Sequence, residues 1–120
     1  MIDRNVQRSI GVEFLGSFAL SFFAVAAAVT GEDVGFLAFA LAPGIATGAM
    51  IAGFGAASLG CFNPALTLCL LLTRAIGLRT AGLAVLCQVV GAIAGALSLY
   101  AIFPSSIFGE VDRGAPTVNT

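Results

Sequence analysis

The sequence predicts an all-α membrane protein with three transmembrane helices and one re-entrant half-helix. Three observations support this fold class. Of the 120 residues, 59% are hydrophobic and 9% are charged, and the mean hydropathy of +1.07 excludes an ordinary soluble domain. Residues 34–73 contain no charged side chain. Within that run, Asn63 and Pro64 form a helix-start signal at a depth that should lie inside the bilayer.

The chain begins with a polar segment, residues 1–9, which carries Asp3, Arg4 and Arg8. We expect this segment to be cytoplasmic. About 20 apolar residues are needed to cross a bilayer, so residues 10–29 form the first predicted span. This run is longer than the apolar core of a cleavable signal peptide, and we expect it to be retained.

A polar turn at residues 30–33 leads into the second predicted span, residues 34–54, which contains Pro43. Residues 55–73 form the predicted re-entrant segment. Its first part is small and uncharged, and its second part is a short helix that begins at Asn63. That helix would be about 16 Å long at a rise of about 1.5 Å per residue, which is about half the hydrocarbon thickness.

The third predicted span covers residues 80–103, and residues 104–120 are expected to be a polar tail or a truncated connecting loop. The arginines predict the orientation. Four of them fall on one side of the membrane if residues 55–73 return to the side they entered: Arg4, Arg8, Arg74 and Arg79. The acidic residues and one arginine fall on the other side: Glu32, Asp33, Glu110, Asp112 and Arg113. This bias predicts a cytoplasmic amino terminus.

Asn63 is the first candidate functional residue. Its side-chain oxygen can cap the short helix, which leaves its amide NH2 group free to hold the oxygen of a passing neutral molecule. The positive end of the helix dipole at this point would oppose the passage of cations. The alternative is a helix cap that is simply packed in protein.

Glu13 is the only charged residue inside an apolar segment, and such a residue is by default a candidate functional residue. Its carboxylate could accept hydrogen bonds from unpaired backbone N–H groups of the re-entrant segment, or it could pair with Arg8 at the membrane face. Gln88, in the third span, could bond the same backbone or make an ordinary interhelical hydrogen bond. The residues alone favour neither reading for either side chain.

An intramembrane enzyme is not expected, because the chain has no histidine to act as a base and no pair of carboxylates. Its three cysteines lack metal-type spacing, so we predict no metal and no cofactor. The net charge of −1 gives no indication of nucleic-acid binding.

Four segments, in order, resemble the aquaporin and glycerol-facilitator family, the major intrinsic proteins. Residues 58–67, Ser-Leu-Gly-Cys-Phe-Asn-Pro-Ala-Leu-Thr, resemble the signature box of that family. The other segments are Glu13-Phe-Leu-Gly-Ser in the first span, Leu41-Ala-Pro-Gly in the second, and the stretch from Gln88 to Tyr100 in the third. The likeness runs from about residue 10 to residue 103 and corresponds to the amino-terminal half of the family.

The resemblance implies one of the two inverted repeats of the family fold, in which each repeat contributes one Asn-Pro-Ala box to a single-file pore. It implies that Asn63, Pro64 and Ala65 lie at the pore centre and that the carbonyls of Gly60, Cys61 and Phe62 line the pore mouth. The matching positions of Glu13 and Gln88 brace the re-entrant loop.

This sequence departs from the family pattern at several points. It has one box where family members have two, and it has no arginine directly after the box. Pro43 replaces the aromatic residue that water-selective members usually place in the second span, and Cys61 replaces a usual histidine. These are positions that set solute choice in the family.

We therefore expect half of an aquaporin-type channel in the plasma membrane, passing water or a small neutral solute such as glycerol. The expected partners are the lipid bilayer and either a second half of the same type or another copy of the chain. Two copies in opposite orientations require a weak arginine bias, which this chain lacks. We favour one of two other routes to a complete pore. The second half is encoded separately, or this chain is a fragment of a longer protein. The alternative function is that of a non-transporting membrane fragment or accessory subunit.

Overall fold

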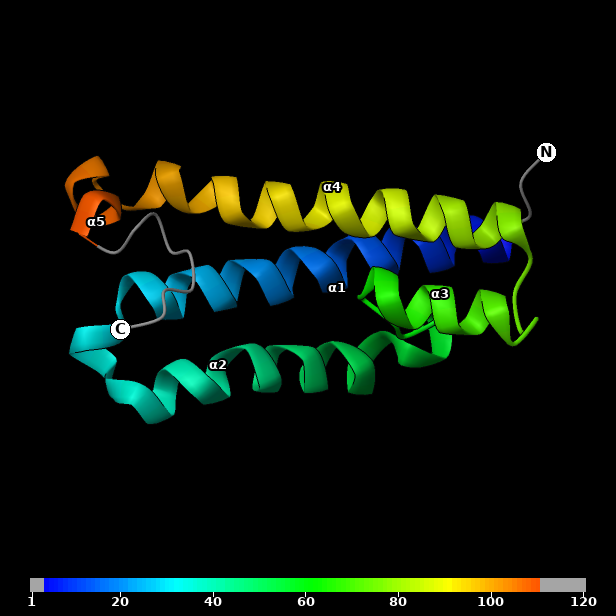
Figure 1. The fold of residues 1–120 in the computed structure, drawn as a ribbon, viewed down its shortest axis with the longest axis horizontal. Helices are drawn as coiled ribbons and strands as arrows, with labels where there is room; N and C mark the ends of the chain where they lie inside the picture. The colour runs from blue at the N-terminus through cyan, green and yellow to red at the C-terminus, as the bar shows by residue number, and fades with distance from the viewer. Residues whose placement is uncertain (1–3, 111–120) are drawn as a thin grey trace.

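The computed structural model describes residues 4–110 and shows an all-helical arrangement, with no strand in that range (Figure 1). Three helices are long and apolar enough to cross a membrane: α1 (Arg4–Val29), α2 (Gly31–Phe54) and α4 (Leu78–Ile102). A helix of 26 residues is about 39 Å long, which exceeds the roughly 30 Å of bilayer hydrocarbon. The predicted fold class is confirmed.

The fourth helix is short and does not cross. Helix α3 (Pro64–Leu72) has 9 residues and is therefore about 14 Å long. After α2, a turn of 3-10 helix, η1 (Gly55–Ala57), and a non-helical stretch lead back toward the middle of the bundle. Helix α3 then runs from the middle to the end at which α4 begins (Figure 1). The chain reverses here instead of crossing.

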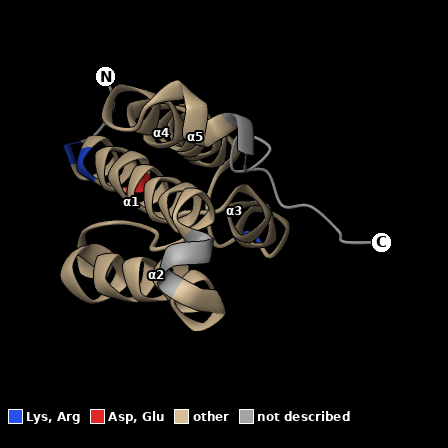
Figure 2. Cartoon of the chain, turned by 90° about the vertical axis from the view of Figure 1, so that its left-hand side faces the viewer, with Lys and Arg blue, Asp and Glu red and all other residues tan. Residues whose placement is uncertain are grey.

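Helix α1 lies at the centre, between α2 on one side and α4 on the other, and α3 packs against α4 (Figures 1 and 2). The contact between α1 and α4 is very close because two glycines of α4 face the backbone of α1. A Cβ atom added at Gly91 would lie 2.4 Å from the carbonyl oxygen of Phe14, and one added at Gly95 would lie 2.4 Å from that of Phe18. Small residues spaced four apart let helices approach in this way in lipid.

Helix boundaries differ from the sequence expectation in three places. Helix α1 begins at Arg4, not at residue 10, because polar residues can continue a helix beyond the hydrocarbon layer. The turn predicted at residues 30–33 lies mostly within α2, which begins at Gly31, and the helix is broken instead at Gly35, with φ 77° and ψ 159°. Within the predicted polar tail, Ser105–Glu110 forms the short helix α5.

Helix α5 packs on the far end of α1 and α4. Phe108 is buried with Val29 and Leu99, and its ring stacks on that of Tyr100 at 4.1 Å between centroids. Asp112 and Arg113 were expected on the side of the membrane opposite to the other four arginines, and both lie outside the described residues.

The arginines of the described chain gather at one end. Arg4 and Arg8 lie at the start of α1, and Arg74 and Arg79 lie in the connection from α3 to α4 and at the start of α4, at the same end of the bundle (Figures 1 and 2). The reversal of the chain before α3 brings these two pairs together. A full crossing would have placed the second pair at the opposite end.

Candidate functional site

The site is built around the start of α3. Asn63 has an extended backbone, with φ −150° and ψ 124°, and its Oδ1 atom accepts a hydrogen bond of 2.8 Å from the backbone N–H of Ala65. Pro64 takes the first helical position, where its missing N–H costs nothing. Asn63 is exposed, and among residues 4–110 its Nδ2 group has no hydrogen-bond partner. The cap therefore leaves two N–H donors free.

Glu13 lies on α1, is 0% exposed and accepts three hydrogen bonds. Its Oε1 accepts from the backbone N–H of Cys61 at 3.2 Å, and its Oε2 accepts from that of Phe62 at 2.7 Å. The third donor is Gln88 Nε2, at 2.7 Å from Oε2. A buried carboxylate needs such donors when no cation is beside it, and here the donors come from the loop and from α4, not from Arg8.

Gln88, on α4, is 1% exposed and joins Glu13 to helix α3. Its Nε2 group also donates to Thr67 Oγ1 at 2.8 Å, and Thr67 in turn donates to the backbone carbonyl of Asn63 at 3.1 Å. Its Oε1 atom is buried and has no partner within the described part of the chain. This network connects α1, the loop, α3 and α4 through side chains that are almost fully buried.

Thr67 is a site residue that sequence reasoning did not single out. It is 0% exposed, although it lies on a helix whose other residues are all exposed or half-buried. The one available signal was its position in the box, four residues after Asn63, where a hydroxyl can reach the carbonyl of the preceding turn.

Phe62 fixes the loop on α1. It is 2% exposed, and its φ of 48° is in the left-handed region, which a bulky residue rarely adopts. Its carbonyl accepts a hydrogen bond of 3.2 Å from Ser17 Oγ. Its ring lies against Gly16, where an added Cβ would be 2.1 Å from a ring carbon. Glu13, Gly16 and Ser17 share one face of α1 and hold this single residue by its N–H, ring and carbonyl.

Of the three carbonyls that the family resemblance assigns to the pore mouth, two remain available. Gly60, at φ 65°, donates its N–H to Ser58 Oγ at 2.9 Å, and the thiol of Cys61 donates to the Leu59 carbonyl at 3.7 Å. In residues 4–110, no donor reaches the carbonyl oxygens of Gly60 and Cys61. The Phe62 carbonyl differs from these two because the Ser17 hydroxyl already occupies one of its acceptor sites.

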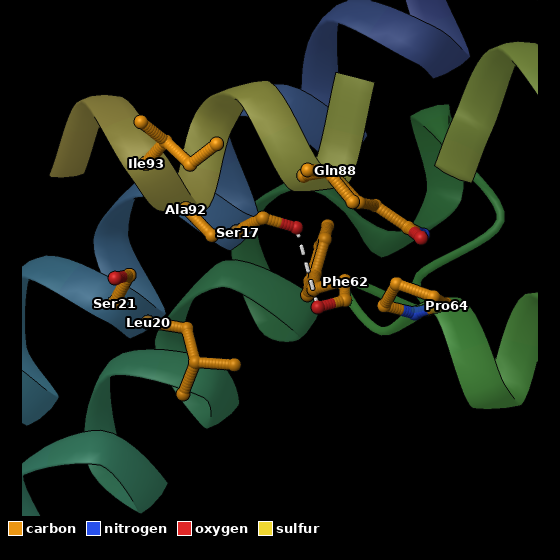
Figure 3. A pocket seen from close by; sticks show the side chains of 9 residues that line it. Ser17, Leu20, Ser21, Phe62, Pro64, Gln88, Ala92 and Ile93 are labelled. Carbon is orange, nitrogen blue, oxygen red and sulfur yellow. Dashed lines mark hydrogen bonds between the residues drawn. The ribbon is translucent and has the colours of Figure 1, made fainter. Parts of the chain in front are cut away.

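A pocket of about 250 Å³ opens beside this site, between α1, α4 and the start of α3 (Figure 3). Its lining includes Phe62 from the loop, Pro64 from α3 and Gln88 from α4. Most of its wall is apolar, with Leu20 and Ile93 on opposite helices.

Pro43 lies within α2 and is not part of the hydrogen-bond network of Glu13, Gln88 and Thr67. Its carbonyl accepts a hydrogen bond of 2.8 Å from Thr47 Oγ1.

The sequence is similar to those of known proteins. A sequence profile described as Major intrinsic protein matches residues 2–119. The chain belongs to the major intrinsic protein family. It is 36% identical to aquaporin-5 from Sus scrofa over 115 residues, which cover 94% of this chain and 43% of that relative.

Other relatives show the same coverage. The chain is 36% identical to the lens fiber major intrinsic protein of Gallus gallus, over 90% of this chain and 42% of that protein. It is 30% identical to aquaporin NIP3-1 from Oryza sativa subsp. japonica, over 98% of this chain and 39% of that protein. The chain thus spans less than half the length of the curated relatives it matches, and it corresponds to their amino-terminal half. It is an integral membrane protein with one repeat of the aquaporin fold.

Proposed function

We propose that this chain is half of a channel that passes water or a small neutral solute such as glycerol, and that it conducts only when a second repeat completes the pore. The observation that carries the proposal is the free Nδ2 group of Asn63 at the start of a half-length helix, next to the free carbonyls of Gly60 and Cys61. Transport is passive and involves no covalent chemistry.

These groups suit a molecule that both accepts and donates hydrogen bonds. The Asn63 amide donates to the solute oxygen, and the carbonyls of Gly60 and Cys61 accept from its hydroxyl groups. A cation at the same point meets the positive end of the α3 dipole. The negative charge of Glu13 does not offset this barrier fully, because its oxygens are directed at three N–H donors away from the passage. Pro43, in the second span, offers no N–H donor to the pore.

The exposure of the box supports completion by a second half. Pro64, Ala65 and Leu66 are exposed at the start of α3, and Leu66 is 53% exposed. The pocket beside Pro64 is open and mostly apolar, as a surface for a further half-helix requires. The second half is encoded separately or belongs to a longer protein that includes this chain. The arginine end is cytoplasmic, and the membrane is the plasma membrane.

The test is osmotic light scattering of proteoliposomes that contain the chain with and without a complementary second half. We expect water or glycerol permeability above that of empty vesicles only with both halves. Asn63→Asp should lower it about tenfold, which corresponds to about 1.4 kcal/mol at the barrier.

Permeability equal to that of empty vesicles with every tested second half would contradict the proposal. It would favour a non-transporting membrane fragment or accessory subunit instead. An Asn63→Asp variant that conducts as well as the unchanged protein would show that Asn63 does not contact the solute.

A further inference from the structure

The short helix α5 is attached to the rest of the bundle by one aromatic side chain. Phe108 is 2% exposed and forms a cluster with Val29, the last residue of α1, and with Leu99, near the end of α4. Its ring also stacks on that of Tyr100, with 4.1 Å between the centroids and 12° between the planes. Phe108 therefore joins α1 and α4 at the end opposite to the arginines (Figure 1).

The connection between α4 and α5 makes a turn that allows this contact. Phe103 follows α4 with an extended backbone, and its N–H donates to the Leu99 carbonyl at 2.8 Å. Pro104 comes next, at a position where proline commonly stops a helix. The carbonyl of Pro104 accepts a hydrogen bond of 3.2 Å from the N–H of Ile107. The chain thus starts a new helix immediately and does not extend away from the bundle.

The position of α5 gives this contact a driving force that the membrane spans lack. Helix α4 is about 37 Å long, so its end reaches beyond the roughly 30 Å of bilayer hydrocarbon. Ser105 and Ser106 are exposed at this level. Packing of apolar surfaces gains nothing from the hydrophobic effect within hydrocarbon, whereas the burial of a phenylalanine ring from water does. Burial of one such ring favours the docked state about tenfold to hundredfold.

We propose that α5 is a clasp that holds the far ends of α1 and α4 together. Nearer the middle of the bundle, the two helices already meet closely at Gly91 and Gly95, where an added Cβ would reach the backbone of α1. Leu99 lies one turn beyond Gly95, and from there outward the ring of Phe108 joins the two helices. Release of the ring frees the last turns of α1 and α4 and leaves the glycine contact in place. The inference is independent of whether the chain conducts a solute.

The chain carries its own reporter of the clasp, because Tyr100 is its only tyrosine. In protein labelled with 3-fluorotyrosine and placed in lipid nanodiscs, the ¹⁹F signal comes from this residue alone and reports on the ring stacked on it. Amide hydrogen exchange in the last turn of α1, residues 26–29, reports on whether the helix ends stay together. We expect Phe108→Ala to shift the ¹⁹F signal and to speed exchange in that turn at least about tenfold.

Two further variants separate the clasp from general effects. Phe36→Ala is the matched control, since Phe36 is 84% exposed near the start of α2, at the same end of the bundle (Figure 1). It should leave the ¹⁹F signal and the exchange rates unchanged. Phe108→Leu keeps an apolar side chain but removes the ring, so it should shift the ¹⁹F signal and speed exchange by less than about threefold.

Three results would overturn the inference. An unchanged ¹⁹F signal in Phe108→Ala would show that the ring of Phe108 does not stack on Tyr100. A shifted signal without faster exchange would show that α5 docks on the two helices without holding them together. Equally fast exchange in Phe36→Ala would assign the effect to a general loss of apolar surface and not to the clasp.

Discussion

The contact between α1 and α4 gives the sharpest prediction, because it sets the distance between Glu13 and Gln88. In Gly91→Ala, the new Cβ would lie 2.4 Å from the Phe14 carbonyl oxygen, 1.0 Å short of the 3.4 Å at which ordinary contact begins. The neighbour is backbone and cannot rotate away, so the helices must separate by about 1 Å. A separation of that size stretches the 2.7 Å bond from Gln88 Nε2 to Glu13 beyond hydrogen-bond range.

The expected loss of stability follows from three contributions. Overpacking costs about 1–3 kcal/mol, and loss of a hydrogen bond to a charged group costs about 1.5–3 kcal/mol. Alanine in place of a helical glycine regains about 1 kcal/mol. We therefore expect Gly91→Ala to lower the free energy of unfolding by about 1.5–5 kcal/mol.

The assay is unfolding by sodium dodecyl sulfate in mixed micelles, followed by far-ultraviolet circular dichroism. Gly82→Ala is the matched control, because it makes the same change on the same helix where an added Cβ meets nothing within 4 Å. That variant should be as stable as the unchanged protein or up to about 1 kcal/mol more stable. If the Gly91 and Gly82 variants unfold at the same detergent fraction, the close contact of α1 and α4 is not present and the reasoning is refuted.

Three smaller predictions concern the re-entrant segment. Thr67→Val removes a buried acceptor of Gln88 and should cost about 1–2 kcal/mol in the same assay; Thr67→Ser should restore it, and equal stability of the valine variant would contradict the network. Asn63→Ala removes the cap and should destabilise the start of α3 by about 1 kcal/mol. Hydrogen exchange at the Ala65 amide should then be about fivefold faster, and unchanged exchange would exclude the cap. Arg74 has φ 59° at the end of α3, so Arg74→Gly should be about 1 kcal/mol more stable than Arg74→Ala, and the reverse order would argue against the left-handed conformation.

Features that depend on neighbouring residues could be predicted from the sequence. The start of α3 is an example: an asparagine that caps, followed by a proline at the first helical position, is sufficient to place it. The three long helices follow from apolar runs of sufficient length. The start of α1 at Arg4 was missed because hydropathy marks the hydrocarbon layer, while the helix itself can continue beyond it.

The residues themselves left two readings open for Glu13, and only the tertiary structure decides between them. The partners of its carboxylate lie 48, 49 and 75 residues away, at Cys61, Phe62 and Gln88, whereas Arg8 was a neighbour on the same helix. The hydrogen bonds of Ser17 with Phe62 and of Thr67 with Gln88 could not be predicted for a related reason. A hydroxyl in a membrane helix can always bond a carbonyl of its own preceding turn, so its presence does not reveal a distant partner.

The sequence by itself therefore determined that this protein is a membrane protein with a helix beginning within the bilayer, because length, hydropathy and capping act over a few residues. The tertiary structure decided which face of α1 meets the loop, since that depends on the rotation of α1 and on its separation from α4. Gly91 and Gly95 allow that separation to be small, and a separation of that size is what brings a buried carboxylate within reach of three donors from distant parts of the chain.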